Sequence, residues 1–453
     1  MGKLMKSISG IRGVVGDTMT PELILQTAYG FARYVKSGKV VIGRDGRPTG
    51  ETISELMEAS LQMLGCDVID LGTVPTPTVQ IMVEELGAAG GIVISASHNP
   101  IEWNAFKLIN SDGTFLNSVQ IKKFFSFCEM PPLLKKYDRM GKKYFEDRAF
   151  SVHINKVLDI IDVKNIRKNK FKVVLDSVNG SGSYITRELF EKLNCEVIPL
   201  YCETNGTFPR IAEPLPENLG DLSKAVIRHK ADIGFAQDPD ADRLAIVDEN
   251  GIPIGEEKTI SLVAEHLLSR EVGRVVVNLS TTKIVEKVAE KYNAPFTRSK
   301  VGEINVVDEM RKKGARIGGE GNGGVISPEV HLGRDSLVGI GYVLDMMSIR
   351  KKTVSQLVSD LPSYFMKKGK VSFNPSRIEK IYSGVKKTYL KEKISELDGI
   401  RIDFEKDSHF AGGWVHLRPS NTEPVFRIIC EGVTEKQMKE IYVFFDKLIK
   451  TFK

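Results

Sequence analysis

Cysteines are few in this sequence, and none is placed for metal binding or for a redox pair. The five cysteines are dispersed and odd in number, with no CxxC pair among the 453 residues. Dispersed cysteines of this kind are typical of a reducing compartment. Long apolar stretches are also lacking: no run approaches 18 residues, and the first residues lack the apolar core of a signal peptide. We therefore expect a cytoplasmic protein with no membrane span.

A strong excess of one charge is lacking as well. The 64 basic and 58 acidic residues leave a net charge of only +6, and the lysines are scattered or in short pairs. Such lysines are typical of a solvated surface rather than of a nucleic-acid footprint. We expect no nucleic-acid partner, and the slight positive balance suits a small anionic substrate. Nothing in the composition indicates an oligomeric state.

What the sequence does have is a repeated alternation of strands and helices. Short β-branched runs alternate with amphipathic stretches, and a strand–helix–strand pattern begins three times, near residues 40, 171 and 274. The length exceeds what one hydrophobic core supports. We predict an α/β protein with three similar mixed α/β domains and a smaller C-terminal α+β domain, at 1–150, 151–252, 253–367 and 368–453.

The C-terminal part follows a different pattern. From about residue 368 the chain is rich in lysine, and Asp398-Gly399 is a turn signal. We predict a helix at 378–397, strands at 400–404, 414–417 and 426–431, and a closing helix at 434–449. Polar stretches predict linkers near 140–155, 248–258 and 365–375.

The first chemical signal stands at the end of an apolar run. A buried strand predicted at 91–94 leads into Ser95-Ala96-Ser97-His98-Asn99-Pro100. Ligands in open α/β sheets bind at the carboxyl ends of strands, so the hydroxyl of Ser97 is a candidate reactive group. As an isolated residue Ser97 would more often be a simple turn former, and His98 would suit turn stabilisation better than proton transfer. Lys107 follows as a nearby basic residue.

The second signal is a loop with three carboxylates. Asp238, Asp240 and Asp242 stand at alternate positions and are followed by Arg243. A short loop can aim such carboxylates at one cation, and hard oxygen ligands suit Mg²⁺. The alternatives are an ordinary acidic turn or an EF-hand, but an EF-hand needs a glycine where Arg243 stands. A metal, a hydroxyl and an arginine together are the parts of a phosphoryl-transfer site.

A third loop is unusually rich in glycine. Residues 318–324 contain five glycines, and the loop follows a predicted strand. Glycine lets the backbone approach a ligand, while Glu320 and Asn322 offer polar atoms to sugar hydroxyls. The alternative is a flexible loop without a ligand.

A fourth loop, residues 418–424, links two predicted strands. It combines the guanidinium of Arg418 with the hydroxyls of Ser420 and Thr422 and the amide of Asn421. Together with backbone N–H groups these form a phosphate cradle. The alternative is a simple turn.

The four loops, in this order, resemble those of the α-D-phosphohexomutase family, which interconverts the 1- and 6-phosphates of hexoses or hexosamines. The resemblance extends from Ser9-Gly10-Ile11-Arg12-Gly13 to Arg427. It implies four domains around a central cleft, of which the first three are topologically alike. That expectation agrees with the repeated strand–helix–strand pattern.

The resemblance also implies a role for individual residues. Ser97 would be the phosphoserine, and one of its phosphate oxygens would complete a Mg²⁺ site. The implied residues are Asp238, Asp240 and Asp242 for the metal; Arg12 and Arg243 for the transferring phosphoryl group; Lys107 as a lysine suspected of acid/base work; Glu320 and Asn322 for sugar hydroxyls; and Arg418, Ser420, Asn421 and Thr422 for the phosphate that is not reacting. Around the reacting phosphoryl group we add His98 as a candidate, and for substrate binding we add Arg427.

Two departures bear on the choice of sugar. The glucose and mannose enzymes of the family commonly carry Ser and His where this chain has Asn322 and Gly324, and often a His where it has Glu303. The third loop, together with Ile101-Glu102-Trp103-Asn104, is most similar to that of phosphoglucosamine mutases. An acidic residue such as Glu303 or Glu320 suits a substrate ammonium. Glu303 would otherwise be an exposed residue at the start of a helix.

We therefore predict a Mg²⁺-dependent mutase that interconverts hexosamine 6-phosphate and 1-phosphate, with glucosamine phosphate favoured. The reaction would pass through the phosphoserine and a hexose or hexosamine 1,6-bisphosphate, which would also act as an activator. Because the sugar must turn around, we expect hinge motion near residues 365–375. The alternatives are the same chemistry on glucose or mannose phosphate, a phosphatase, and a non-catalytic phosphosugar-binding protein.

Overall fold

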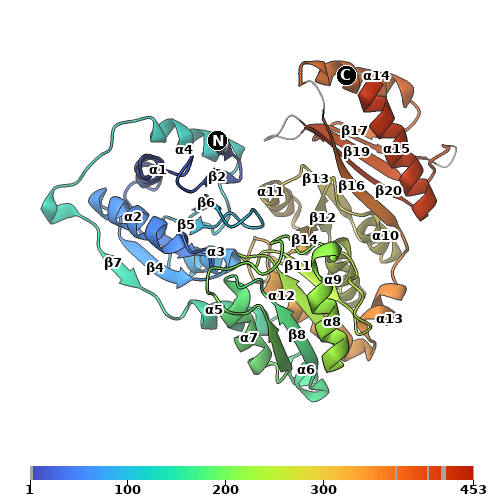
Figure 1. Cartoon of the computed structure of the whole chain (residues 1–453), viewed down its shortest axis with the longest axis horizontal. Coiled ribbons are helices and arrows are strands. Elements are labelled where there is room, and N and C mark those ends of the chain that lie inside the picture. The colour runs from blue at the N-terminus through green and yellow to red at the C-terminus, as the bar shows by residue number, and fades with distance from the viewer. Residues whose placement is uncertain (1–3, 373–374, 406–407, 420–424, 452–453) are drawn as a thin grey trace.

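The computed structural model describes residues 4–372, 375–405, 408–419 and 425–451, and its sheets form four domains (Figure 1). The N-terminal domain has a mixed seven-stranded sheet in the order β1-β2-β6-β5-β3-β4-β7. Its strands are β1 (Met5–Ser7), β2 (Gly10–Val14), β3 (Val40–Arg44), β4 (Val68–Thr73), β5 (Gly90–Ile94), β6 (Trp103–Asn110) and β7 (Lys143–Phe145). Its helices are α1 (Pro21–Tyr34), α2 (Gly50–Met63), α3 (Thr76–Glu85) and α4 (Ser118–Cys128).

The second domain repeats the pattern with a four-stranded sheet in the order β11-β10-β8-β9. Strands β8, β9 and β10 are parallel, and β11 is antiparallel to β10. The elements are α5 (Ala149–Leu158), α6 (Val163–Asn169), β8 (Lys172–Asp176), α7 (Gly182–Lys192), β9 (Glu196–Leu200), α8 (Gly220–His229), β10 (Ile233–Gln237) and β11 (Leu244–Val247).

The third domain has the same arrangement, with a sheet in the order β13-β12-β14-β15 and β15 antiparallel. Its strands are β12 (Val275–Asn278), β13 (Phe296–Ser299), β14 (Ile317–Glu320) and β15 (Gly324–Ile326). Its helices are α9 (Glu257–Arg270), α10 (Lys283–Lys291), α11 (Glu303–Lys313), α12 (Ser336–Arg350) and α13 (Val354–Ser359). Helix α12 contacts α5 and α6 of the second domain as well as α9. One hydrophobic core therefore joins the second and third domains.

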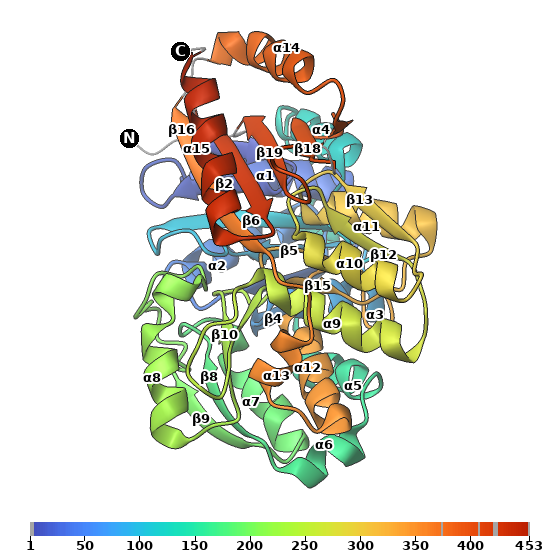
Figure 2. The same cartoon turned by 90° about the vertical axis from the view of Figure 1, so that its right-hand side faces the viewer.

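The C-terminal domain is smaller, and its five-stranded sheet, in the order β16-β20-β19-β18-β17, is entirely antiparallel. Helix α15 runs along this sheet, and α14 lies at one end of the domain (Figure 2). Its own core is separate from that of the other domains. The elements are β16 (Phe365–Ser372), α14 (Ile378–Thr388), β17 (Lys393–Ser395), β18 (Ile400–Asp403), β19 (Trp414–Pro419), β20 (Val425–Gly432) and α15 (Glu435–Thr451).

These sheets confirm the predicted fold class of three mixed α/β domains and a smaller C-terminal α+β domain. Three details of the prediction are wrong. The linker predicted near 140–155 contains β7 and the first part of α5. The helix predicted at 378–397 ends at Thr388, and β17 follows it. The linker predicted at 365–375 is mostly β16, which pairs over eight residues with β20. The stretch is polar, with Lys367, Lys368 and Lys370, because β16 lies at the edge of the sheet, where charged side chains are favoured. This polarity suggested a linker.

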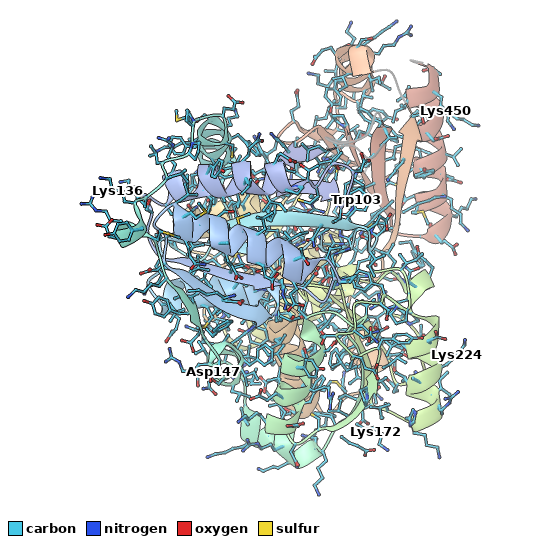
Figure 3. The ribbon with its side chains drawn as sticks, turned by 60° about the vertical axis from the view of Figure 1, so that its left-hand side comes forward. Trp103, Lys136, Asp147, Lys172, Lys224 and Lys450 are labelled. Carbon is cyan, nitrogen blue, oxygen red and sulfur yellow. The ribbon has the colours of Figure 1, made fainter. Side chains whose placement is uncertain are left out.

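The surface agrees with the prediction of scattered lysines. Lys136, Lys172, Lys224 and Lys450 point outward from separate parts of the molecule (Figure 3). Within the described residues, no helix is both long enough and apolar enough to span a membrane.

Candidate active site

The serine predicted to react lies just beyond β5 in a constrained backbone. Ser97 has φ +50°, a conformation in the left-handed region that residues other than glycine rarely adopt. Its N–H donates to Ser95 Oγ at 2.9 Å, and Ser95 Oγ donates to Asp45 Oδ2 at 2.6 Å. The buried hydroxyl of Ser97 then donates to Asp238 Oδ2 at 2.8 Å. The sharp turn thus directs the serine of the first domain onto the loop 238–243 of the second domain, the predicted metal loop.

A buried arginine that the sequence analysis did not identify holds this turn. The guanidinium of Arg47 donates to the backbone oxygens of Ser97, Asn99, Pro100 and Trp103, at 2.6 to 3.0 Å. Its Nε donates to Asp45 at 3.1 Å. Both residues follow β3, which is parallel to β5 and adjacent to it. The rule that ligands bind at strand ends could therefore have identified this pair.

The three aspartates form a cluster that suits a hard cation. Asp238, Asp240 and Asp242 are fully buried, and one carboxylate oxygen of each lies within 4.8 Å of the others. Burial and the two neighbouring carboxylates raise the pKa of Asp238 well above its usual value. Among the described groups, Oδ1 of Asp240 and Oδ1 of Asp242 have no hydrogen-bond donor. Buried anionic oxygens without donors call for a positive charge, so these residues fit a metal ion.

Two basic residues border this cluster. The ammonium of Lys107 contacts Asp240 and lies 3.2 Å from Asp242 Oδ2. Burial opposes its charge, but Asp240 and Asp242 outweigh that effect and raise its pKa. Arg243 Nε lies 3.9 Å from Asp238 Oδ2 and from Asp242 Oδ1, and its Nη1 donates to Glu213 at 2.9 Å. Lys107 and Arg243 therefore supply positive charge beside the predicted reacting hydroxyl.

Arg12 and His98 complete the surroundings of Ser97. Arg12 Nη1 donates to Asn99 Oδ1 at 2.7 Å. His98 Nδ1 lies 3.4 Å from Ser97 Oγ. Burial, together with the positive charges of Arg243 and Arg12, lowers the pKa of His98 well below its usual value. The structure thus brings the four residues predicted around the reacting phosphoryl group together with Ser97 and the metal loop.

The glycine-rich loop 318–324, the predicted sugar loop, is connected to the metal loop through Arg334, which the sequence did not indicate. Arg334 Nη1 donates to Glu320 Oε2 at 2.9 Å, and its Nε donates to Glu303 Oε2 at 3.0 Å. Its Nη2 donates to Asp242 Oδ2 at 2.6 Å. Glu303 does begin helix α11, but it is buried rather than exposed. Asn322 is half-buried, and its Oδ1 accepts from the N–H of Gly324 at 3.2 Å within the loop.

The predicted phosphate cradle lies in the C-terminal domain. Arg418 in β19 is the cross-strand partner of Arg427 in β20. Arg418 Nη1 lies 3.4 Å from Asp398 Oδ2, which accepts from the N–H of Val301 at 3.1 Å. The cradle is thereby connected to the third domain near Glu303. The remaining predicted cradle residues, Ser420, Asn421 and Thr422, lie outside the described residues.

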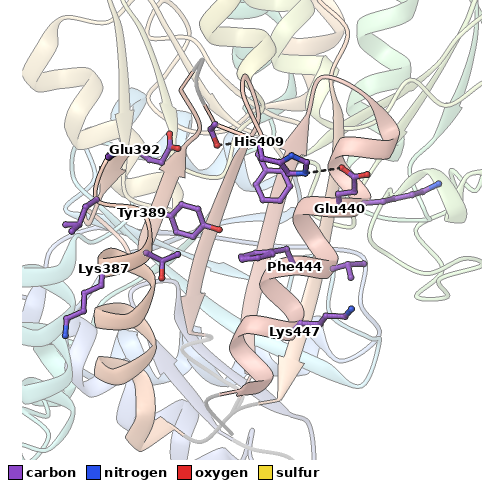
Figure 4. Close-up of a pocket in the computed structure, with 14 residues that line it drawn as sticks. Lys387, Tyr389, Glu392, His409, Glu440, Phe444 and Lys447 are labelled. Atoms are coloured by element: carbon purple, nitrogen blue, oxygen red, sulfur yellow. Dashed lines mark hydrogen bonds and ion pairs between the residues drawn. The ribbon is translucent and has the colours of Figure 1, made fainter.

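A separate pocket of about 940 Å³ opens on the C-terminal domain, where the end of α14 faces α15 (Figure 4). Tyr389 and Phe444 line it together with His409 and several lysines. None of the predicted site residues that the structure describes lines this pocket. The predicted chemistry depends instead on the buried loops described above.

Models of known protein families match the chain in four consecutive parts. They describe domains I, II and III of phosphoglucomutase/phosphomannomutase, all alpha/beta/alpha, and its C-terminal domain. The matched residues are 4–127, 151–251, 256–365 and 375–448.

Individual proteins agree with this match. A probable phosphoglucosamine mutase of Methanopyrus kandleri is 33% identical, with 97% of this chain and 96% of the relative covered. A phosphoglucomutase/phosphomannomutase of Thermococcus kodakarensis is 34% identical over 99% of each chain. The crystal structure of a phosphoglucomutase/phosphomannomutase family protein from Burkholderia thailandensis superposes with a TM-score of 0.84 at 25% identity, covering 99% of this chain and 98% of that one. The chain belongs to the phosphoglucomutase/phosphomannomutase family, as its four loops predicted.

Proposed function

We propose that this chain is a Mg²⁺-dependent phosphohexosamine mutase of the cytoplasm, which interconverts hexosamine 6-phosphate and 1-phosphate. Its family membership makes it an intramolecular phosphotransferase, and relatives named as probable phosphoglucosamine mutases support the amino sugar. The observation that carries the proposal is the hydrogen bond from Ser97 Oγ to the buried aspartate cluster.

The reaction cycle begins with phosphate on Ser97. The P–Oγ bond breaks while a new P–O bond forms to the free hydroxyl of the sugar monophosphate, giving a bisphosphate. The bisphosphate turns around and returns its other phosphoryl group to Ser97. Arg12, Lys107 and Arg243 lie around the reacting atoms and counter the negative charge of the phosphoryl group. A Mg²⁺ held by Asp238, Asp240 and Asp242 would neutralise charge on the transferring group.

Two residues beside the reacting atoms differ in their protonation. His98 lies beside Ser97 Oγ and is kept neutral by burial between cations, which also makes it a weak base. Lys107 is held in its charged form by Asp240 and Asp242, so it suits a proton donor or a fixed counter-charge. A base role for Lys107 would require the ammonium to lose its proton, which these carboxylates oppose.

A second candidate function differs from the first only in the sugar, and a specific observation favours it. Glu303 and Glu320 are buried acidic groups that share the single positive charge of Arg334 with Asp242, and an ammonium on the sugar would compensate the negative charge that remains. A Thermococcus relative at 34% identity, however, is named a phosphoglucomutase/phosphomannomutase. Transfer to glucose or mannose phosphate is therefore the second candidate.

The test measures kcat/KM for glucosamine, glucose and mannose 6-phosphates side by side. We expect the highest value for glucosamine 6-phosphate, with stimulation by added bisphosphate. Mass spectrometry should find about 80 Da on the Ser97 peptide in part of the protein. Ser97→Ala should lose both the modification and the activity, whereas Ser126→Ala on the exposed face of α4 should keep them.

Other outcomes separate the alternatives. Release of inorganic phosphate without a 1-phosphate product would indicate a phosphatase. Sugar phosphate binding without turnover or modification would indicate a non-catalytic binding protein. Full activity of Ser97→Ala without added bisphosphate would overturn the proposal.

A further inference from the structure

One guanidinium joins three carboxylates that come from three separate segments of the chain. Arg334 is 8% exposed, and each of its three guanidinium nitrogens donates to a different partner. These partners are Glu303 at the start of α11, Glu320 at the end of β14, and Asp242 in the metal loop. Because Asp242 belongs to the second domain and the glutamates to the third, Arg334 bridges the two loops.

A missing side chain makes this bridge possible. The side chain of Arg334 crosses the backbone of Gly324 in the sugar loop. A Cβ on Gly324 would collide with Cδ of Arg334 and would lie 2.8 Å from its Cγ. The ion pairs hold this part of Arg334 in place, so it cannot yield as a free side chain would. Any larger residue at position 324 would push the guanidinium away from its partners.

The backbone of Arg334 is fixed as well. Its N–H donates to Glu303 Oε1 at 3.3 Å. The next residue, Asp335, caps helix α12 through the N–H of Leu337 at 2.8 Å. Asp335 Oδ2 also lies within hydrogen-bonding distance of His153 Nε2, at 2.7 Å, and of His331 Nε2, at 3.2 Å. Arg334 is therefore held at its backbone and at its guanidinium. Its position is determined by the fold rather than by the substrate.

We propose that Arg334 is a positioning residue, which holds the sugar-loop carboxylates in register with the metal loop and which depends on Gly324 for its path. The inference rests on the proposed function for its effect on turnover. A guanidinium presents five donors in a fixed plane, so it can serve three carboxylates at once. A lysine at this position would keep the charge but could not hold all three.

Removing this cation should affect catalysis and metal binding in opposite directions. Without Arg334, Glu303 and Glu320 lose their common anchor, and misplaced groups can cost about 100-fold in kcat/KM. At the same time Asp242 Oδ2 loses a donor at 2.6 Å and a nearby positive charge. Mg²⁺ should then bind about tenfold more tightly, since a competing cation has left the cluster. Simple loss of packing would weaken both.

The experiment is a double-mutant cycle. Arg334→Gln, Gly324→Ala and the combined variant are compared in kcat/KM for glucosamine 6-phosphate and, by calorimetry, in Kd for Mg²⁺ without sugar. We expect each single change to lower kcat/KM about 100-fold and to tighten Mg²⁺ binding, and the combined variant to be no worse than either. Arg334→Lys should not restore turnover.

Matched controls separate this effect from general damage. Arg311→Gln removes another ion pair of the third domain, to Asp112, away from the site. Gly220→Ala adds a Cβ that meets no atom within 4 Å. Both should leave kcat/KM and the Kd for Mg²⁺ unchanged.

Three results would overturn the inference: additive losses in the combined variant, full turnover of Arg334→Lys, or an unchanged or weaker Kd for Mg²⁺ in Arg334→Gln. Circular dichroism identifies a variant that fails to fold, and Arg334→Lys then carries the test because it keeps the charge. If the wild-type protein turns over none of the sugar phosphates, the proposed function fails. Calorimetry still decides the role of Arg334 in that case.

Discussion

The region around Ser97 and the region around Arg418 are held in different ways. Around Ser97, charged side chains of three domains are buried and contact one another directly. Helix α3 illustrates this arrangement, because Thr76 contacts Asp240, Thr78 lies 2.9 Å from His153, and Gln80 lies 3.5 Å from Glu303. One short helix of the first domain thus meets the metal loop, the second-domain helix α5 and the start of helix α11 in the third domain.

The C-terminal domain is also attached to the third domain by polar contacts, but its hydrophobic core is its own. Glu431 accepts from the N–H of Lys283 at 2.8 Å and from the hydroxyl of Thr282, so a carboxylate of one domain caps helix α10 of the other. His416 lies 2.9 Å from Ser280 Oγ, and Arg401 donates to the backbone oxygen of Leu279. Arg401 also lies over the ring of Trp414 at 3.9 Å.

The difference indicates which part of the molecule can move. The second and third domains share a hydrophobic core, so separating them would expose apolar surface. The C-terminal domain keeps its own core and exchanges hydrogen bonds, which water can replace, when it moves. We expect the reacting region to stay fixed while the C-terminal domain moves as a body. The hinge for this movement, which we expected near residues 365–375, cannot lie within 365–372, because these residues form β16 of the C-terminal sheet.

The largest expected effect comes from changing the fixed region at its metal loop. Asp240→Asn removes one of three anionic ligands, and metal stabilisation of a transferring group is worth several kcal/mol, so kcat/KM should fall by about three orders of magnitude. The rise in Tm that Mg²⁺ produces should also disappear.

Asp221→Asn on the exposed part of α8 is the matched control and should keep both kcat/KM and the Mg²⁺-dependent rise in Tm. An unchanged kcat for Asp240→Asn at saturating Mg²⁺ would contradict the assignment of the metal loop.

A smaller effect is expected in the movable region. Arg418→Lys keeps the charge and loses the fork that grips a phosphate at two points. A charge-assisted hydrogen bond is worth roughly 1.5–3 kcal/mol, so kcat/KM should fall by about one to two orders of magnitude. If either end of the sugar places its phosphate in the same cradle, the loss should be equal in the forward and reverse directions.

Arg350→Lys on α12, where the guanidinium binds Glu265, is the control and should keep kcat/KM. A loss for Arg418→Lys in one direction only would show that the two ends of the sugar are held by different groups.

How much the sequence could predict differs between the same two regions. Ser97 and the aspartates follow strands directly, so a local pattern places them at a sheet edge where ligands bind. The strand–helix–strand repeats and the separate C-terminal domain were likewise readable from local periodicity. The edge strand β16 was missed because its lysines look like those of a linker, and only its pairing with β20 distinguishes the two.

Arg334 and Glu431 could not be predicted, for a different reason. Their partners lie in segments far away in the sequence, and nothing local distinguishes Arg334 before α12 or Glu431 in β20 from ordinary charged residues. Buried ion pairs between domains depend on how the domains pack. The sequence therefore indicates the groups that do chemistry better than the groups that hold them in place.

The smallest expected effect concerns the interface of the C-terminal domain and its pH dependence. Burial lowers the pKa of His416 to about 4, against an ordinary value of 6.5. The unfolded chain therefore binds a proton between pH 6.5 and 4 that the folded chain does not. Stability is lost as the pH falls through this window, and from pH 7 to pH 6 the loss due to His416 should be about 1 kcal/mol.

His416→Gln should remove this part of the pH dependence, whereas His229→Gln on the exposed end of α8 should leave it unchanged. The measurement is urea unfolding at pH 7 and pH 6 in a Trp103→Phe background, where the buried Trp414 reports on this domain. If His416→Gln keeps the full pH dependence, the burial of His416 beside Ser280 does not contribute to the stability of the C-terminal domain. The difference between a fixed reacting region and a movable cradle would then rest on Glu431 and Arg401.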